Sequence, residues 1–150
     1  MSKLIAILLI CSTTFGSASA QFRALPAPVT DAFKKQYPNA SQAAWSDKLS
    51  NWQVIFVLDS AAGKYTARYD SKGTWKGTEQ TITGDKLPAA VKDGYDKSKY
   101  TDEWKITEYT ALYLPGNVIK YRLLVKKSGI QKKYLYFNAS GKLLEDNSTL

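Results

Sequence analysis

The sequence predicts an α+β fold: two tandem helix-plus-antiparallel-sheet units that form one curved sheet, with the helices packed on one face. Two observations lead to this expectation. Leu-Pro-Ala followed by Val-x-Asp-x-aromatic occurs at residues 25–33 and again 62 positions later, at residues 87–95. Each copy is followed by segments rich in β-branched and aromatic residues, with Gly-containing breaks between them. A repeat of this length indicates one supersecondary unit used twice.

Each unit is expected to begin with a helix, over residues 25–38 and 87–100. A proline near the start suits the first turn of a helix, where its missing N–H removes no hydrogen bond. Val29 and Phe33 fall on one helical face, and the matching positions of the second copy repeat this apolar stripe. Each helix is therefore expected to bury one stripe against the sheet.

The strands are expected to form antiparallel hairpins, because β-formers alternate with turn signals every eight to twelve residues or so. The last strand of the second unit is expected to be cut short by the polar tail "EDNSTL". The expected strands cover residues 52–59, 64–70, 75–83, 103–114, 118–125 and 133–138, with a final one that begins at Leu143.

Two similar turn motifs, "DSKG" at residues 70–73 and "NASG" at residues 138–141, could be read as metal-binding loops. A calcium loop needs oxygen ligands at alternate positions, and each motif offers one good ligand and a nearby lysine. A structural role fits better: Asp or Asn caps its own turn, and Gly supplies the positive φ that closes the hairpin. We therefore predict turns, and no metal.

The first twenty residues have the pattern of a secretory signal peptide, with an apolar run and a small-residue close that predicts cleavage after Ala20. Cys11 could instead carry a lipid anchor, but the bulky Ile10 before it argues against that. We predict an exported chain, periplasmic or secreted, without a transmembrane segment. Its single domain covers residues 21–150, with two repeats at about 25–83 and 87–144.

Cleavage would leave a chain without Cys, His or Met. That composition excludes Cys–His and Ser–His–Asp nucleophile systems and zinc sites built on thiolate or imidazole. Nothing in the sequence implies a cofactor. The net charge of +8 falls to +7 when Lys3 leaves with the leader, and the remaining lysines are spread in pairs. A dispersed surplus of this kind is typical of a solvated basic surface.

Taken together, these motifs resemble the PepSY-like, β-lactamase-inhibitor-like family of bacterial cell-envelope proteins. The resemblance rests on "VTDAFKKQYPNA", Trp45, "YTARYDSKGTW", Thr78-Glu79 and "LPAAV", and it covers essentially the whole mature chain. It implies tandem helix-plus-sheet units in one curved antiparallel sheet, export to the periplasm and no known enzymatic activity. The inhibitor part of the family name does not by itself carry a function.

If the helices cover one face of the sheet, the other face is the natural place for a partner. Strand alternation assigns mixed aromatic, aliphatic and basic side chains to that open face. Tyr and Arg are common interface anchors, although an open sheet face also holds long polar side chains without any partner. The candidate binding residues are Arg68, Lys120, Arg122, Tyr134 and Tyr136.

The leading hypothesis is therefore a non-enzymatic binding or inhibitor-like module of the cell envelope that recognises an envelope protein. One alternative is binding to a polyanion or envelope surface through basic residues such as Lys132 and Lys133. Export argues against nucleic acid as that polyanion. A second alternative is a hydrolase that uses two carboxylates. Its candidates are Asp70, Glu79, Glu103 and Glu108.

Overall fold

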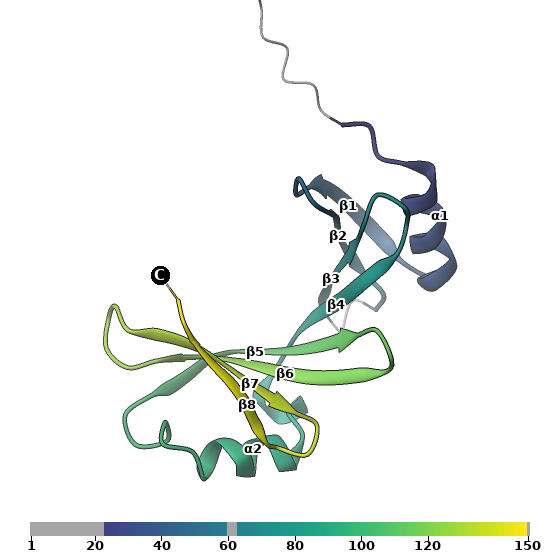
Figure 1. Ribbon diagram of the computed structural model, residues 1–150. Helices are drawn as coiled ribbons and strands as arrows, with labels where there is room; N and C mark the ends of the chain where they lie inside the picture. Colours follow the sequence, from purple (N-terminus) through teal and green to yellow (C-terminus); the bar gives the residue numbers. More distant parts are fainter. Residues whose placement is uncertain (1–22, 60–62, 150) are drawn as a thin grey trace, which may run out of the picture.

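The structure is a computed structural model and describes residues 23–59 and 63–149. The predicted signal peptide, its cleavage after Ala20 and Cys11 lie outside the described residues. Within them, one antiparallel sheet runs in the order β1-β2-β3-β4-β5-β6-β7-β8 (Figure 1). The elements are α1 (Ala27–Gln36), β1 (Ser41–Asp47), β2 (Trp52–Val57), β3 (Lys64–Tyr69), β4 (Trp75–Ile82), the 3₁₀ turn η2 (Gly84–Lys86), α2 (Ala89–Asp96), β5 (Lys105–Leu114), β6 (Val118–Lys126), β7 (Lys132–Asn138) and β8 (Leu143–Ser148).

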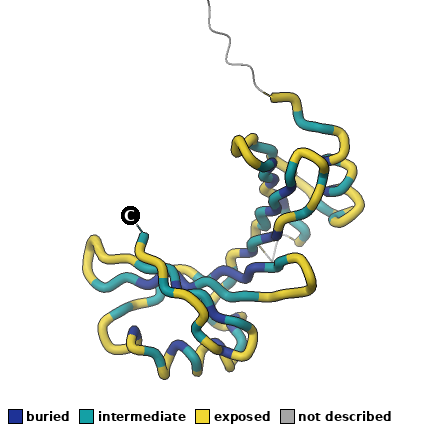
Figure 2. Tube along the Cα trace, in the orientation of Figure 1, coloured by how far each residue is buried: buried dark blue, intermediate teal, exposed yellow. Residues whose placement is uncertain are grey.

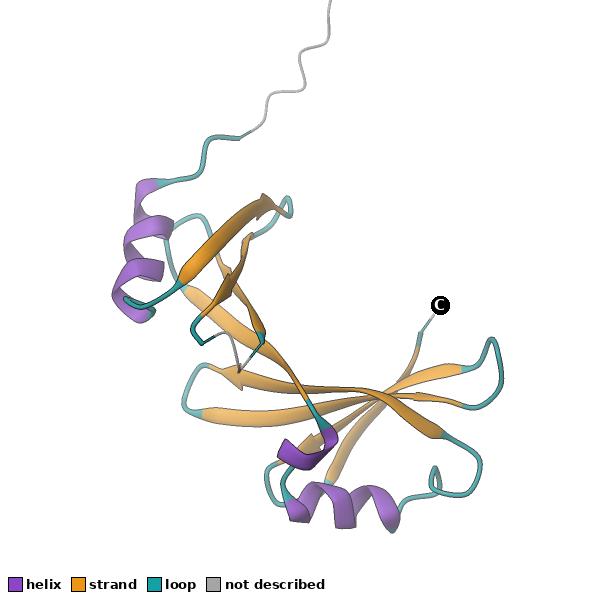
Figure 3. Cartoon of the chain, turned by 180° about the vertical axis from the view of Figure 1, so that it is seen from behind, coloured by secondary structure: helices purple, strands orange, loops and turns teal. Residues whose placement is uncertain are grey.

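Both helices pack on the same face of the sheet. Directly paired residues of neighbouring antiparallel strands share a face, so the register carries one face from Phe56 through Tyr65, Gln80 and Ala111 to Tyr121. Phe56 belongs to the core under α1, and Tyr121 packs against the core under α2. Figures 1 and 3 show the sheet bent between its two halves, with α1 and α2 on the outer side of the bend. The open face therefore lines the inner side.

The first core lies between α1 and β1–β4 and is mostly aromatic. Phe33 of α1 is its centre: the ring centroid lies 5.0 Å from Phe56, 5.3 Å from Trp45 and 6.4 Å from Tyr69. All three contacts are edge-to-face, the arrangement that aromatic quadrupoles favour. Val29, one turn before Phe33 in α1, is fully buried. The apolar stripe predicted for the first helix is confirmed.

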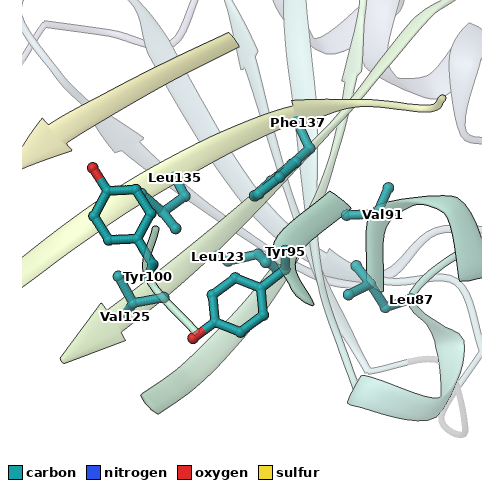
Figure 4. Packing of buried hydrophobic residues seen from close by; sticks show 8 residues of the cluster. All are labelled: Leu87, Val91, Tyr95, Tyr100, Leu123, Val125, Leu135 and Phe137. Atoms are coloured by element: carbon teal, nitrogen blue, oxygen red, sulfur yellow. The ribbon is translucent and has the colours of Figure 1, made fainter. Parts of the chain in front are cut away.

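The second core lies between α2 and β5–β8 and is largely aliphatic (Figure 4). Tyr95 and Tyr100 close it, and the Tyr95 hydroxyl donates a hydrogen bond to the carbonyl oxygen of Trp104 at 2.7 Å. The Tyr100 hydroxyl donates to the Asp146 carboxylate. The buried members of this core are Leu87, Val91, Tyr95, Tyr100, Leu123, Val125, Leu135 and Phe137.

The two turn motifs form the same turn in both halves, as predicted. Asp70 Oδ1 accepts from the backbone N–H groups of Lys72 and Thr74 at 3.0 and 2.9 Å. In the second half, Asn138 Oδ1 accepts from two backbone N–H groups at 3.1 and 2.9 Å. Both turn glycines have positive φ, +83° and +84°, and a β-bulge lies beside each turn. Asp or Asn and Gly are therefore turn residues in both motifs.

The turn glycines also dock the helices, a role that the sequence did not predict. A Cβ added to Gly73 would lie 2.4 Å from the carbonyl oxygen of Pro28, and one added to Gly141 would lie 2.0 Å from that of Ala90. In both halves the turn thus lies directly against the first turn of the helix. Only glycine permits both the backbone conformation and this approach.

Two strands at the sheet edges were not predicted correctly. β1 was missed, and β8 continues through the polar tail instead of stopping. Edge strands bury little, so they carry weak alternation; in β1 only Trp45 packs against the core. Figure 2 shows burial concentrated along the inner strands and exposure at the hairpin tips and helix surfaces.

Candidate binding face

All five predicted binding residues lie on the open face of the sheet. Arg122 of β6 pairs with Thr110 of β5 and Tyr136 of β7, so these three side chains form one cross-strand row. The neighbouring positions of the same two strands, Lys120 and Tyr134, share that face because side chains alternate. Arg68 reaches the same face from β3 in the first half. The structure thus brings residues from both halves together.

Glu79 of β4 connects the two arginines, and the sequence had suggested it only as a hydrolase candidate. Arg68 donates from Nη1 to Glu79 Oε1 at 2.5 Å, and Arg122 donates from Nη2 to Glu79 Oε2 at 2.9 Å. The side chains of Arg122 and Glu79 are only 22% and 21% exposed. One carboxylate therefore bridges a guanidinium from each half of the molecule.

Two opposing effects set the ionisation of Glu79. Burial alone would raise its pKa, but the hydrogen bond from Arg68 and the charge of Arg122 outweigh burial and hold the pKa below its ordinary value. Burial likewise opposes the charge of Arg122, and the Glu79 carboxylate more than compensates, so the pKa of Arg122 is raised. Glu79 is thus ionised at neutral pH and is poorly suited to act as a general acid.

A pocket of about 180 Å³ opens on this face beside the ion-pair cluster. Gly77 contributes to it: its φ of +144° is one that side-chain-bearing residues rarely adopt, and an added Cβ would lie 3.1 Å from Leu114 Cδ2. The missing side chain at this position keeps the pocket open opposite Arg68, its partner in β3. The lining residues are Arg68, Lys76, Gly77, Thr78, Glu79, Leu112, Leu114, Arg122 and Tyr136.

Tyr134 and Lys120 lie beside this pocket. The Arg122 guanidinium carbon lies 5.1 Å from the centroid of the Tyr134 ring, and this cation–π contact helps to hold the arginine in place. Lys120 Nζ lies 4.0 Å from Glu145 Oε1 of β8. Of the five predicted residues, Arg68, Arg122 and Tyr136 line the pocket, Tyr134 supports it, and Lys120 lies next to it.

The basic cluster considered for polyanion binding is split by the structure. Lys133 pairs with Val125 on the helix-bearing face, where its Nζ lies 3.8 Å from Asp146 Oδ1. Lys132, one residue earlier in the strand, points to the opposite face. The two lysines therefore do not form one basic surface.

Two of the other carboxylates considered for hydrolysis, Asp70 and Glu103, also have structural partners, whereas Glu108 is exposed on β5. Asp70 caps its turn and lies 3.0 Å from Lys76, and Glu103 pairs with Lys127. The residues described contain no group of three or more Asp, Glu, Cys or His side chains placed to hold a metal ion. Among these residues, too, no helix is long and apolar enough to cross a membrane.

A second hollow, of about 340 Å³, lies on the helix-bearing face and was not predicted. Tyr37, Tyr65, Trp75 and Tyr113 line it together with Thr78. The Thr78 hydroxyl is 2.6 Å from the Tyr37 hydroxyl and accepts from Trp75 Nε1 at 2.9 Å. Three of these rings come from the first half of the chain and Tyr113 from the second. Alternation within a single strand therefore could not indicate this hollow.

The model of the family described as "Putative beta-lactamase-inhibitor-like, PepSY-like" matches residues 50–145. The chain belongs to this family. The matched segment includes β2 to β7 and the first half of β8, and with them the whole ion-pair cluster. Comparison with curated proteins finds no match.

Solved structures with the same fold come from Bacteroides. A BLIP-like protein from Bacteroides fragilis is 24% identical with a TM-score of 0.77, over 86% of this chain and 89% of that one. A DUF2874 family protein from Bacteroides uniformis is 23% identical with a TM-score of 0.75, over 82% and 88%. A structure from Bacteroides eggerthii, described as "putative periplasmic proteins", is 23% identical with a TM-score of 0.74, over 84% and 90%. At these identities the likeness establishes the fold.

Proposed function

We propose that this protein is an exported, non-enzymatic binding module of the bacterial cell envelope that recognises a protein partner through the open face of its sheet. The observation that carries the proposal is the bridged cluster Arg68–Glu79–Arg122, with Tyr134 and Tyr136 beside it. Tyr and Arg in a fixed, half-buried arrangement are the residue types that anchor protein interfaces.

The architecture supports this location. The helices cover the other face, so the inner side of the bend is the face of the sheet left open to a partner (Figure 3). Two arginines held by one carboxylate are pre-organised, and a pre-organised side chain loses less conformational entropy when it binds. The family description and the periplasmic description of one similar structure agree with an envelope location and an inhibitor-like role.

The proposal includes two further parts. A signal peptide over residues 1–20 is cleaved after Ala20, which places the mature chain in the periplasm or outside the cell. Residues 21–150 then form one domain of two repeats, at about 25–83 and 87–144. The equivalent helix–turn contacts of Gly73 with Pro28 and of Gly141 with Ala90 support common repeats.

Capture from envelope extract tests the binding function. The mature protein is used as bait beside a double variant, Arg122→Glu with Tyr134→Ala, and beside Lys34→Glu as a control. Lys34→Glu makes the same change of charge on the exposed surface of α1. We expect one protein to be retained by the wild type and the control and lost with the double variant, while circular dichroism shows that all three fold alike.

The opposite result is equally clear. If the captured proteins are the same for all three baits, the open face is not the binding site. If only polyanions are captured, and increasing salt removes them steeply, the polyanion alternative replaces this proposal.

A further inference from the structure

We propose that the pocket at Arg68, Glu79 and Arg122 receives the carboxylate of an Asp or Glu side chain that a protein partner presents. This inference rests on the proposed function, because it names the partner's chemistry for the same face. It follows from the charge balance of the pocket, from its size and from the side chains around it.

The cluster has a net charge of +1, because it holds two guanidinium groups and one carboxylate. Two guanidiniums share the single carboxylate of Glu79, and each is bonded to it through one terminal nitrogen. A guanidinium has five N–H donors in a planar fork, so both arginines retain donors beyond those bonds. An incoming carboxylate can accept from them in the bidentate manner that arginine favours.

The neighbouring carboxylates do not neutralise this excess positive charge. Asp70 lies 3.0 Å from Lys76 and Glu145 lies 4.0 Å from Lys120, so each has its own cation at the edge of this face. The surplus charge therefore remains at Arg68 and Arg122. Because both side chains are partly withdrawn from water, a charge placed between them is screened less than one on the outer surface.

The pocket has the size of one side chain. Its volume of about 180 Å³ is well above the ~10–15 Å³ that a single water needs, so it admits a group as large as a side-chain carboxylate. Leu112, Leu114 and Tyr136 line it beside the arginines and offer apolar contact to the methylene groups of Asp or Glu. Inorganic phosphate has no such apolar part. The combined lining therefore favours an acidic side chain over a free anion.

A peptide titration tests this inference without the partner. The probes are Ac-Gly-Glu-Gly-NH2, its neutral counterpart Ac-Gly-Gln-Gly-NH2, and inorganic phosphate. Binding is followed by nuclear magnetic resonance through the Nε–Hε signals of Arg68 and Arg122 in the full mature chain. We expect the Glu peptide to shift both signals and the Gln peptide to leave them in place.

Two variants and a control give the expected direction. Glu79→Gln removes the competing carboxylate, so affinity for the Glu peptide should rise about tenfold. Arg122→Met should lower it about tenfold or more. Arg23→Met is the matched control, because Arg23 is also paired with one carboxylate, that of Asp47, but lies outside the pocket; affinity should not change. The backbone amide spectrum of each variant shows whether it folds.

Several results would overturn the inference. These are equal shifts with the Gln peptide, tighter binding of phosphate than of the Glu peptide, or no gain of affinity in folded Glu79→Gln. If the open-face variant loses a captured protein but no probe binds, the proposed function stands and this inference is wrong. If the Glu peptide binds as expected but capture does not depend on this face, the proposed function fails and the carboxylate preference of the pocket stands.

Discussion

The two halves of the molecule share a plan but pack it differently. Each has a helix, four strands and the same capped turn against the helix. The first core is built from interlocking aromatic rings, and the second mainly from aliphatic side chains. At the position three residues before the turn cap, the first half has Ala67 and the second has Leu135, both fully buried. The two cores are thus filled by side chains of different size at equivalent positions.

The two helices also differ in how closely they approach the turn beside them. Ala32 of α1 and Gly94 of α2 are equivalent, 62 residues apart. A Cβ added to Gly141 would lie 2.0 Å from the carbonyl oxygen of Ala90, whereas one added to Gly73 would lie 2.4 Å from that of Pro28. A Cβ at Gly94 would also lie 2.0 Å from the carbonyl oxygen of Gly141. The second helix therefore lies closer to its turn than the first does. The first half therefore has room for the methyl group of Ala32, whereas the second half has no room for one at Gly94.

The largest effect is expected from Gly94→Ala. The new methyl group meets backbone, which cannot move without shifting α2 or the turn, so we expect a loss of about 3 kcal/mol or more in the free energy of unfolding. The control is Ala32→Gly, which should cost only about 1 kcal/mol through helix propensity. Urea unfolding measures both. A smaller loss for Gly94→Ala than for Ala32→Gly would contradict the closer packing of α2.

An intermediate effect is expected from exchanging the residue that lies three positions before each turn cap. Leu135→Ala leaves a cavity in the second core and should cost about 2–5 kcal/mol. Ala67→Leu adds volume to a closed aromatic core and should cost about 1–3 kcal/mol. The measurement is again the urea midpoint. If Ala67→Leu does not destabilise the protein, the first core has room that the ring contacts do not suggest.

The smallest effect is expected at the turn cap itself, where the halves carry Asp70 and Asn138. The hydrogen bond from Lys76 and the N–H of Thr74 lower the pKa of Asp70 to about 2, from an ordinary 3.8. A lowered pKa in the folded state adds stability above the ordinary value, and that stability is lost as pH falls from about 4 to about 2. Asp70→Asn should keep the turn, as Asn138 does, and reduce this acid sensitivity.

Urea unfolding at pH 7, 4 and 2 measures the effect of Asp70→Asn. The free energy of unfolding of the variant should lie below that of the wild type at pH 7 and 4, and the two values should approach each other at pH 2. Asn138→Asp is the reciprocal variant. An unchanged pH dependence in Asp70→Asn would show that the ion pair with Lys76 contributes nothing to stability.

Local signals predicted much of the fold. The helices, the inner strands and the turns follow from prolines, alternation and Asp-x-x-Gly or Asn-x-x-Gly patterns that act within about ten residues. The edges were harder: β1 and β8 have little alternation because they bury little. Their pairing is stabilised by the neighbouring strand and not by a strong sequence pattern of their own.

The candidate site was predicted only in part, and the reason is distance along the chain. Alternation placed Arg68 and Arg122 on the open face correctly, but it could not show that Glu79 bridges them. Glu79 is 11 residues from Arg68 and 43 from Arg122. Which side chains meet across several strands depends on register, bulges and bend, and no local pattern encodes these.

The sequence by itself determined which side chains face the helices and how the two turns close, because these depend on backbone preferences and on burial within one element. Only the tertiary structure decided that Gly73 and Gly141 are docking points as well as turn residues, and that one carboxylate joins arginines from both halves. Such contacts exist only once the strands are paired, since burial and charge act between residues that the chain itself keeps far apart.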